Sequence, residues 1–387
     1  MAKLGEVCLI NPKSCTLRDD TEVSFIPMTK VGEHGEFDAS EIKNYSEVKK
    51  GFTNFQNGDI LFAKITPCME NGKGAIAHNM KNGIGFGSTE FHVLRPDTDK
   101  ITSEWLYYLT TWKAFRKEAE RNMTGSAGQK RVPKTFLENY VVNLPDIDTQ
   151  KSENKILRKV DDLIFLRKQQ LAKLDELVKA RFVEMFGDDI YPKVKVSRVC
   201  DFITKGTTPP NNLISEKYSS DKVPYLKVYN LSFTGKLLFD TAPQYVPENI
   251  HNGVLARSKV YPNDVLMNIV GPPLGKFALV TDEFSEWNIN QAIAIFRAKE
   301  KVNPKYLLFA LMQPEVLKPF LRQAVGIRQL NLSLAQCRDL EIPLPPLSLQ
   351  SEFAAFVERV DQQKQTVQQS LEKLELMKKA LMQEYFG

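Results

Sequence analysis

The sequence predicts an α/β protein: two homologous mixed α/β domains joined by two long helices, which form an antiparallel coiled coil in a pseudo-two-fold internal repeat. Three observations predict this architecture. The 387-residue chain matches itself at an offset of 200 residues, each copy contains short strand-like runs between turn signals, and each copy ends in a long stretch without Pro or Gly.

The repeat is clearest in the last part of each copy. Residues 141–187 and 341–387 share 14 identities in 47 positions without a gap, whereas ordinary residue usage gives roughly three by chance. Both stretches end in Phe-Gly. Nearer the middle of each copy the match slips by five residues, so that Gly58–Ile65 aligns with Asn263–Val270. Two tandem copies that differ by loop insertions explain this pattern.

The repeat divides the chain into four parts. Two globular domains are expected at residues 1–149 and 188–349, and two spacer helices at 150–187 and 350–387. Each globular part is long enough for a core of its own.

The globular parts combine strand and helix signals. The strand-like runs are VSFIPM, GDILFAKI, EFHVLRP, VPYLKV, KFALV and AIAIFRA. Helical patterns follow at Ser103–Arg121 and Pro304–Gln323, where Pro314 and Pro319 should break or bend the second. Each domain is therefore expected to be mixed α/β.

The spacer helices carry an apolar seam with three-four spacing. Its residues are Leu157, Val160, Ile164, Leu171, Leu174 and Val178 in the first helix, and Val357, Val360, Val367, Leu371, Leu374 and Leu381 in the second. An isolated amphipathic helix is marginal in water, so each seam needs a partner. Each helix packs either on its own domain or on the other helix. An internal two-fold makes the second arrangement antiparallel, and about 36 residues give a rod of roughly 54 Å.

Composition excludes several classes of protein. No apolar run approaches the length that spans a bilayer, and the net charge of +5 is compatible with a polyanionic partner without requiring one. The five cysteines show no Cys-x-x-Cys spacing, which favours a reducing cytoplasm and no metal site.

Catalytic motifs fail on inspection. The segment Gly271–Phe277 resembles a phosphate-binding loop but is one residue short and lacks the Ser or Thr that holds magnesium. Glu153 and Lys155 suggest a metal-dependent nuclease, yet the second copy has Phe353 and Ala355 at these positions. We expect a chain that is not an enzyme.

Polar and basic loops recur at similar places in both copies. Lys and Arg can bind phosphates, while Gln, Asn and Arg can also read base edges, although a solvated surface role competes for each residue. The DNA-binding candidates are Lys64, Lys73, Ser126, Gln129, Lys130, Arg131 and Lys134 in the first copy, and Lys205, Thr207, Lys227, Asn230, Asn268, Lys276, Arg328, Gln329 and Asn331 in the second.

The order of short motifs carries a family resemblance. Leu-Gly-Glu near the N-terminus, Gly-Asp-Ile-Leu with a downstream Gly-Lys, a Gly-x-x-Gln loop and Leu-Pro-x-x-x-x-Gln before a long helix occur in this order, and their counterparts recur in the second copy. The chain resembles the specificity subunit of type I restriction-modification systems. The resemblance implies two target-recognition domains, each reading one half of a bipartite, asymmetric sequence in double-stranded DNA.

The resemblance also implies partners. The coiled coil would set the spacing between half-sites and dock two modification (methyltransferase) subunits, with restriction subunits joining through the complex. This chain would bind no cofactor, while its partners would use S-adenosylmethionine, and ATP with magnesium for restriction. A bacterial or archaeal cytoplasmic protein without membrane contact is expected. The alternative is a coiled-coil scaffold that joins two protein partners without binding DNA.

Overall fold

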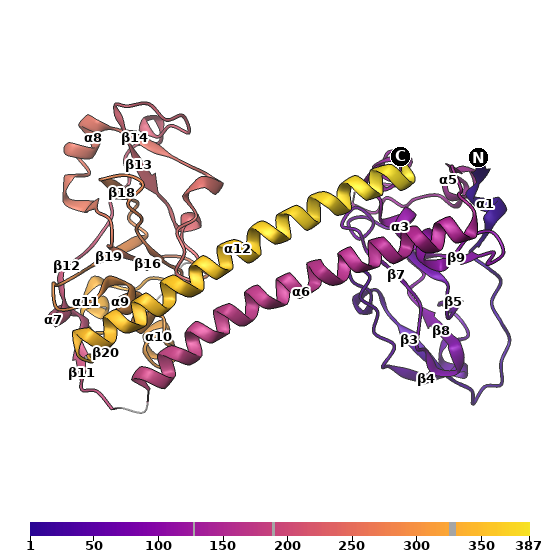
Figure 1. The fold of residues 1–387 in the computed structure, drawn as a ribbon, viewed down its shortest axis with the longest axis horizontal. Coiled ribbons are helices and arrows are strands. Elements are labelled where there is room, and N and C mark those ends of the chain that lie inside the picture. Colours follow the sequence, from indigo (N-terminus) through magenta and orange to yellow (C-terminus); the bar gives the residue numbers. More distant parts are fainter. Residues whose placement is uncertain (127, 188–189, 325–329) are drawn as a thin grey trace. The chain divides into compact units, whose positions relative to one another are not determined.

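The structure is a computed structural model that describes residues 1–126, 128–187, 190–324 and 330–387. These residues form two compact units, whose residues can be located in Figure 1 by colour, because the ribbon is coloured by residue number. The first contains Met1–Lys168 and Gln369–Gly387, and the second contains Gln169–Gln368. Each unit therefore combines one globular domain, the beginning of the long helix that follows it, and the end of the other long helix.

The first domain begins with a mixture of short strands and helices. Its strands are β1 (Ala2–Lys3), β2 (Cys8–Ile10), β3 (Glu22–Ile26), β4 (Ile42–Asn44), β5 (Thr53–Gln56), β6 (Ile60–Ala63), β7 (Gly74–Ile76), β8 (Ile84–Gly87), β9 (Phe91–Pro96) and β10 (Val141–Val142). Its helices are α1 (Leu4–Val7), α2 (Tyr45–Val48), α3 (Ser103–Thr111), α4 (Lys113–Arg121) and α5 (Lys134–Asn139), followed by the long helix α6 (Ile147–Phe186).

The second domain repeats this order. Its strands are β11 (Lys193–Lys195), β12 (Cys200–Lys205), β13 (Lys222–Leu226), β14 (Tyr245–Pro247), β15 (Lys259–Val260), β16 (Val265–Asn268), β17 (Phe277–Leu279), β18 (Trp287–Ile289), β19 (Ile293–Ala298) and β20 (Glu341–Pro343). Its helices are α7 (Val196–Val199), α8 (Glu248–Asn252), α9 (Pro304–Leu311), α10 (Pro314–Leu321) and α11 (Leu334–Asp339), followed by α12 (Leu347–Phe386).

Sheet topology confirms the duplication. One four-stranded sheet has the order β2-β9-β6-β7 in the first domain and β12-β19-β16-β17 in the second. The other has the order β4-β3-β8-β5 and β14-β13-β18-β15, with one parallel pair in each, β3 with β8 and β13 with β18. A short antiparallel pair, β1 with β10 or β11 with β20, precedes each long helix. All six strand-like runs named from the sequence lie on strands.

Strand β6 is buried on both faces, which sets the layers of the first domain. Ile60 and Phe62 belong to one core with Trp105 of α3, whereas Leu61 belongs to another core with Phe55 of β5. Side chains alternate between the two faces of a strand, so β6 joins a helical layer on one side to the second sheet on the other. The turn that follows β6 and the turn that precedes β9 lie at the edge of these packed layers.

The helical patterns are interrupted in both domains. The single helix expected over Ser103–Arg121 divides into α3 and α4, because Trp112 has extended backbone angles (φ −61°, ψ 129°). In the second domain Pro314 begins α10, where a missing N–H costs nothing, and Pro319 lies inside that helix. The break expected from Pro314 is confirmed, while the break at Trp112 has no proline to mark it.

The glutamine that opens each long helix ties that helix to its own domain. Gln150 is fully buried; its Oε1 accepts the Thr102 N–H at 2.9 Å, and its Nε2 donates to the Lys100 and Pro145 carbonyls, both at 2.9 Å. Gln350 is also fully buried, where its Oε1 accepts the Asn303 N–H at 2.9 Å and its Nε2 donates to Pro345 at 2.8 Å. The motif Leu-Pro-x-x-x-x-Gln therefore encodes a hydrogen-bonded joint.

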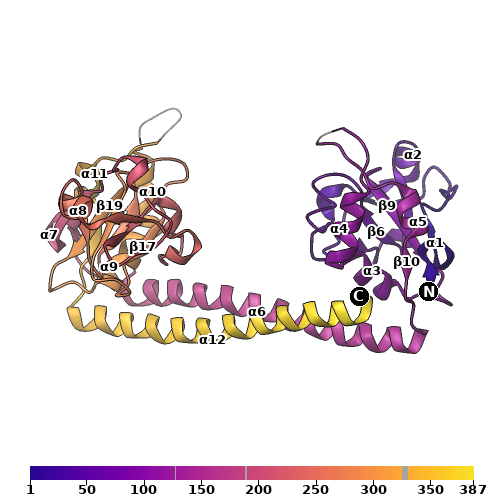
Figure 2. The ribbon, with the colours of Figure 1, turned by 90° about the horizontal axis from the view of Figure 1, so that it is seen from above.

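The repeated Phe-Gly ending completes the core of each unit. In the first unit Phe386 at the end of α12 packs on Trp105 of α3, with ring centroids 4.8 Å apart, and Figure 2 shows this end of α12 against α3. In the second unit Phe186 at the end of α6 packs edge-on against Tyr306 of α9 at 5.0 Å. Trp105 and Tyr306 are both the third residue of equivalent helices, so the two contacts correspond.

Polar contacts show that the two long helices run antiparallel in each unit. The pairs are Asp161–Lys378 (2.6 Å) and Arg167–Ser370 (3.2 Å) in the first unit, and Asp175–Lys364 (2.5 Å) and Arg181–Glu352 (3.1 Å) in the second. In each unit a step forward along α6 is a step backward along α12. Lys364 and Lys378 occupy seam positions of α12, and each finds an aspartate of α6.

The predicted seam lies on the covered side of the helices. Leu157, Val160, Val178, Val357, Val360, Val367 and Leu371 are buried, and Ile164, Leu171, Leu174, Leu374 and Leu381 are half-buried. In the first unit Leu157 and Met382 belong to one core with Tyr108 of α3. Both seams therefore pack on the partner helix and on a globular domain, rather than on only one of the two.

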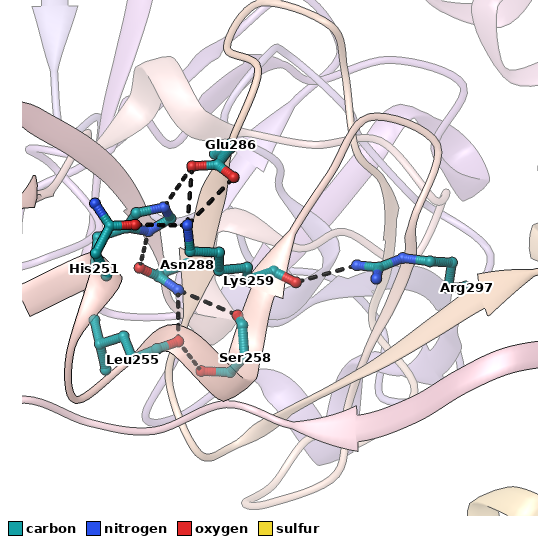
Figure 3. Close-up of polar contacts among 8 residues, drawn as sticks. His251, Leu255, Ser258, Lys259, Glu286, Asn288 and Arg297 are labelled. Atoms are coloured by element: carbon teal, nitrogen blue, oxygen red, sulfur yellow. Dashed lines mark hydrogen bonds and ion pairs between the residues drawn. The ribbon is translucent and has the colours of Figure 1, made fainter.

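A buried histidine organises one side of the second domain. His251 of α8 is fully buried between Asn288 of β18 and Glu286, with Nδ1 2.6 Å from Asn288 Oδ1 and Nε2 2.8 Å from Glu286 Oε2 (Figure 3). Asn288 donates to the carbonyls of Leu255 (3.4 Å) and Ser258 (3.2 Å). This network holds α8 and the following loop against β18.

We predict that replacing Gln150 with Ala lowers the free energy of unfolding by about 1–3 kcal/mol, because three backbone groups lose their partner in a buried site. The exposed Gln169 on the same helix is the control, and Gln169→Ala should change stability by less than about 0.5 kcal/mol. Denaturant unfolding of the full chain measures both variants. If Gln150→Ala and Gln169→Ala changed the free energy of unfolding equally, the hydrogen bonds of Gln150 would not contribute to stability.

We also predict a pH-dependent contribution from Glu286. The hydrogen bond from His251, assisted by Lys259, holds the pKa of Glu286 below its ordinary value of 4.5 against the opposing effect of burial. A lowered carboxyl pKa stabilises the fold above the unfolded-state pKa, and this contribution is lost as pH falls through the folded-state pKa. Glu286→Gln should therefore destabilise the chain at pH 7, by less than about 1 kcal/mol because the carboxylate is partly exposed, and less at pH 4.

The exposed neighbour Glu283 provides the control, since Glu283→Gln should leave stability unchanged at both pH values. Denaturant unfolding at pH 7 and pH 4 measures the two variants. A Glu286→Gln effect that is the same size at both values would contradict the prediction.

Candidate nucleic-acid interface

Three separate segments of the first domain meet where β6 ends and β9 begins. The Lys64 N–H donates to the Glu90 carbonyl at 2.9 Å, and the Val132 N–H donates to the Lys64 carbonyl at 2.9 Å. The Thr66 N–H donates to the Lys130 carbonyl at 3.1 Å. We call this set of backbone bonds the three-segment frame, because it joins the β6–β7 loop, the β8–β9 turn and the basic loop before α5.

The second domain contains the same frame. The Ile269 N–H donates to the Ala292 carbonyl at 2.8 Å, and the Leu332 N–H donates to the Ile269 carbonyl at 2.9 Å. The Gly271 N–H donates to the Leu330 carbonyl at 2.8 Å. Three bonds in the same order make Ile269 the counterpart of Lys64, and Ala292 the counterpart of Glu90.

One further pair of positions corresponds. Arg131 forms an isolated antiparallel bridge with Ile65, and Asn331 forms one with Val270. Arg131 and Asn331 therefore occupy equivalent places in the two frames. The two bridges therefore align Arg131 with Asn331. Their numbers differ by 200, the same offset that relates the two long helices.

An arginine–carboxylate pair lies on the first frame. Arg131 Nε donates to Glu90 Oε2 and Nη2 donates to Glu90 Oε1, both at 2.8 Å, while Nη1 donates to the Gln129 carbonyl at 3.0 Å. The hydrogen bonds from Arg131 hold the pKa of Glu90 below its usual range. Glu90 is therefore a carboxylate at neutral pH, and it fixes the plane of the guanidinium.

Lys64 and His92 are the other titratable side chains of this frame. Burial lowers the pKa of Lys64, an effect that the charge of Glu90 opposes. Burial also lowers the pKa of His92, whose Nε2 donates to the Val132 carbonyl at 2.8 Å. His92 is thus a neutral structural residue of β9, while Lys64 adds positive charge beside Arg131.

The other candidates of the first domain lie on the loops around this frame. Those exposed on the basic loop are Ser126, Gln129 and Lys130. Lys134 begins α5 and is exposed, although its Nζ forms an ion pair with Glu138 at 2.8 Å. Lys73 is half-buried and donates to the Met28 carbonyl at 3.2 Å, which fixes it to the neighbouring hairpin.

The candidates of the second domain are more dispersed. The exposed ones are Lys205 and Asn331, and the half-buried ones are Thr207, Lys227 and Lys276. Thr207 Oγ1 accepts a hydrogen bond from Arg257 Nε at 3.0 Å. Arg257 is an exposed cation that the sequence did not single out, because it belongs to none of the repeated loop motifs.

Two candidates must be corrected. Asn230 and Asn268 are fully buried, so neither side chain reaches a surface that DNA could contact. Asn230 accepts the Lys227 N–H at 2.9 Å, and Asn268 accepts the Lys276 N–H at 2.7 Å while donating to the Pro273 carbonyl at 2.9 Å. Both asparagines shape turns. Arg328 and Gln329 lie outside the described residues.

Glu153, set aside above as a nuclease residue, has a structural hydrogen bond instead. Glu153 Oε2 accepts the indole N–H of Trp105 at 2.8 Å, so the carboxylate helps to join α6 to α3. Over residues 1–126, 128–187, 190–324 and 330–387, no group of three or more His, Cys, Asp or Glu side chains is arranged to hold a metal ion. In the same part of the chain, every helix is too short or too polar to cross a membrane.

Comparisons with known proteins agree with the duplicated architecture. The model of the family described as type I restriction modification DNA specificity domain matches residues 1–176 and 191–376. The specificity subunit of the Escherichia coli type I restriction enzyme EcoAI is 46% identical over 178 residues, covering 44% of this chain and 30% of that protein. The EcoEI specificity subunit of Escherichia coli is 41% identical over 179 residues, covering 44% of this chain and 29% of that protein.

The matches to these two relatives thus span less than a third of each relative's length. A solved structure described as bearing on complex assembly and conformational transition of the type I R-M system superposes with a TM-score of 0.63 at 19% identity, covering 99% of this chain and 96% of that one. This superposition shows a shared fold. With both copies matched by the family model, the chain belongs to the family of type I restriction-modification DNA specificity domains.

Proposed function

We propose that this chain is the DNA-reading subunit of a type I restriction-modification complex. Each domain reads one half of a bipartite, asymmetric target, and the two long helices set the gap between the halves. The chain itself catalyses nothing. Modification subunits that use S-adenosylmethionine methylate the DNA, and restriction subunits use ATP with magnesium.

One observation carries this proposal: the three-segment frame occurs twice with different side chains. The first frame presents Lys64, Glu90 and Arg131, and the second presents Ile269, Ala292 and Asn331 at positions defined by the same backbone bonds. Sequence is read by side chains that reach base edges, whereas phosphate contacts only position the protein. Equal frames with unequal side chains suit two half-sites of different sequence.

Exposed apolar side chains on the long helices support docking of the modification subunits. In the first unit, Phe165 and Leu166 of α6 are 60% and 54% exposed, and Leu376 of α12 is 67% exposed. These side chains lie outside the seam, and exposed apolar groups that lie together can mark a protein-interaction site. Docking on the helices would leave the loops of both domains open for DNA. The alternative, a scaffold that does not bind DNA, does not explain why the two frames carry side chains of different charge.

The proposal predicts a defined DNA target. The chain is co-expressed with its modification subunits, and the methylated adenines of the host genome are mapped by sequencing. We expect one motif with two short specified segments separated by a constant unspecified gap, their centres about 10 base pairs apart, the length of one helical turn. The control is a strain without this gene. An assembled complex that produces no motif and enriches no sequence would favour the scaffold.

The spacing proposal predicts the effect of shortening both helices. Deletion of residues 165–171 and 368–374 removes one heptad from each helix and keeps the pairs Asp161–Lys378 and Asp175–Lys364. The rod becomes about 10 Å shorter. The mapped motif should lose about three base pairs of its gap. Deletion from α6 alone puts the ion pairs out of register and should prevent assembly. A paired deletion with the original gap would contradict the proposal.

A further inference from the structure

The pair formed by Glu90 and Arg131 leaves one edge of the arginine for a ligand. A guanidinium has five N–H donors. Within the described part of the chain, one donor on Nε and one on Nη2 bind Glu90, and one on Nη1 binds the Gln129 carbonyl. One N–H remains on each terminal nitrogen, and the Arg131 side chain is 41% exposed. Two parallel donors on a fixed plane match the O6 and N7 acceptors of guanine.

The second domain shows that this pair is not needed for folding. The same backbone bonds form there with Ala292 and Asn331 at the equivalent positions. The copy that lacks the arginine also lacks the carboxylate. A carboxylate kept beside an arginine on a DNA-facing loop repels phosphates and lowers general affinity for DNA. Its presence therefore requires a benefit other than stability of the frame.

We propose that Arg131 reads a guanine in the half-site of the first domain, and that Glu90 is the positioning residue that holds its guanidinium for this contact. This inference rests on the proposed function, since it names a base that the first domain selects. The second domain carries no arginine at this position and reads its half-site by other groups.

Opposite effects on specific and general binding distinguish this role from a structural one. Glu90→Gln removes a negative charge, so affinity for DNA of unrelated sequence should rise. The same variant loosens the guanidinium, so preference for the selected sequence should fall. A residue that only repels DNA would raise both affinities equally, and a residue remote from DNA would change neither.

The experiment uses the complete complex of this chain with its modification subunits. Wild-type complex selects from a random-sequence duplex library, and binding is then measured on the enriched duplex and on a scrambled duplex of equal length and composition. The variants are Glu90→Gln, Arg131→Lys and the double variant Glu90→Ala with Arg131→Asn. The double variant installs the residues that the second domain carries on the same frame, so its backbone bonds should remain intact.

We expect the enriched motif to contain a guanine that all three variants relax, while the rest of the motif is kept. Arg131→Lys and the double variant should lower the ratio of specific to scrambled binding by about 10-fold to 100-fold, the range for one bidentate base contact. Glu90→Gln should lower this ratio by about 5-fold and raise binding to the scrambled duplex. The control Lys130→Ala, an exposed cation of the same loop, should weaken binding to both duplexes equally.

The inference is overturned if no guanine relaxes in the variants, or if all three keep the wild-type ratio. It is also overturned if Glu90→Gln raises both affinities by the same factor. These outcomes leave the proposed function standing, because wild-type complex has then enriched a sequence. Failure of the wild-type complex to enrich any sequence removes the proposed function, and this inference with it.

Discussion

The fold depends on the packing of each helix end on a domain from the other copy. Phe386 packs on Trp105 in the first unit, and Phe186 packs on Tyr306 in the second. Long amphipathic helices gain most of their stability from such tertiary contacts, because the helix alone is marginal in water. In each unit the last aromatic residue of the other copy's helix packs against the core of the domain. The repeated Phe-Gly ending therefore places the last residues of each copy against the domain of the other copy.

In both domains the backbone hydrogen bonds of the frame are the same, whereas the side chains that the frame carries differ. The three-segment frame consists of backbone hydrogen bonds, which do not depend on side-chain identity, so its geometry survives replacement of Lys64 by Ile269 or of Arg131 by Asn331. The helix joints depend on side-chain identity instead. Both copies use a glutamine, Gln150 or Gln350, whose side-chain amide makes the hydrogen bonds. Reading chemistry can thus differ between domains while their attachment to the helices stays fixed.

Long-period features of this molecule were predictable from the sequence, and local exposure was not. The repeat, the six strand runs and the seam follow from periodicity, which survives loop insertions. Asn230 and Asn268 were misjudged because an asparagine that caps a buried turn has the same sequence signature as one on a surface loop. The break at Trp112 has no Pro or Gly to announce it. The pair of Glu90 and Arg131 joins residues 41 positions apart, a contact that only the frame creates.

The ion pairs between the helices have a consequence for faithful assembly. Asp161 and Asp175 both belong to α6, and their lysines both belong to α12. In the same register, two copies of α6 would bring Asp161 against Val178 and Asp175 against Ile164, so that two carboxylates would lose their counterions in an apolar seam. Two copies of α12 would instead face Lys364 with Glu375. Pairing of α6 with α12 is therefore favoured over pairing of α6 with a second copy of α6.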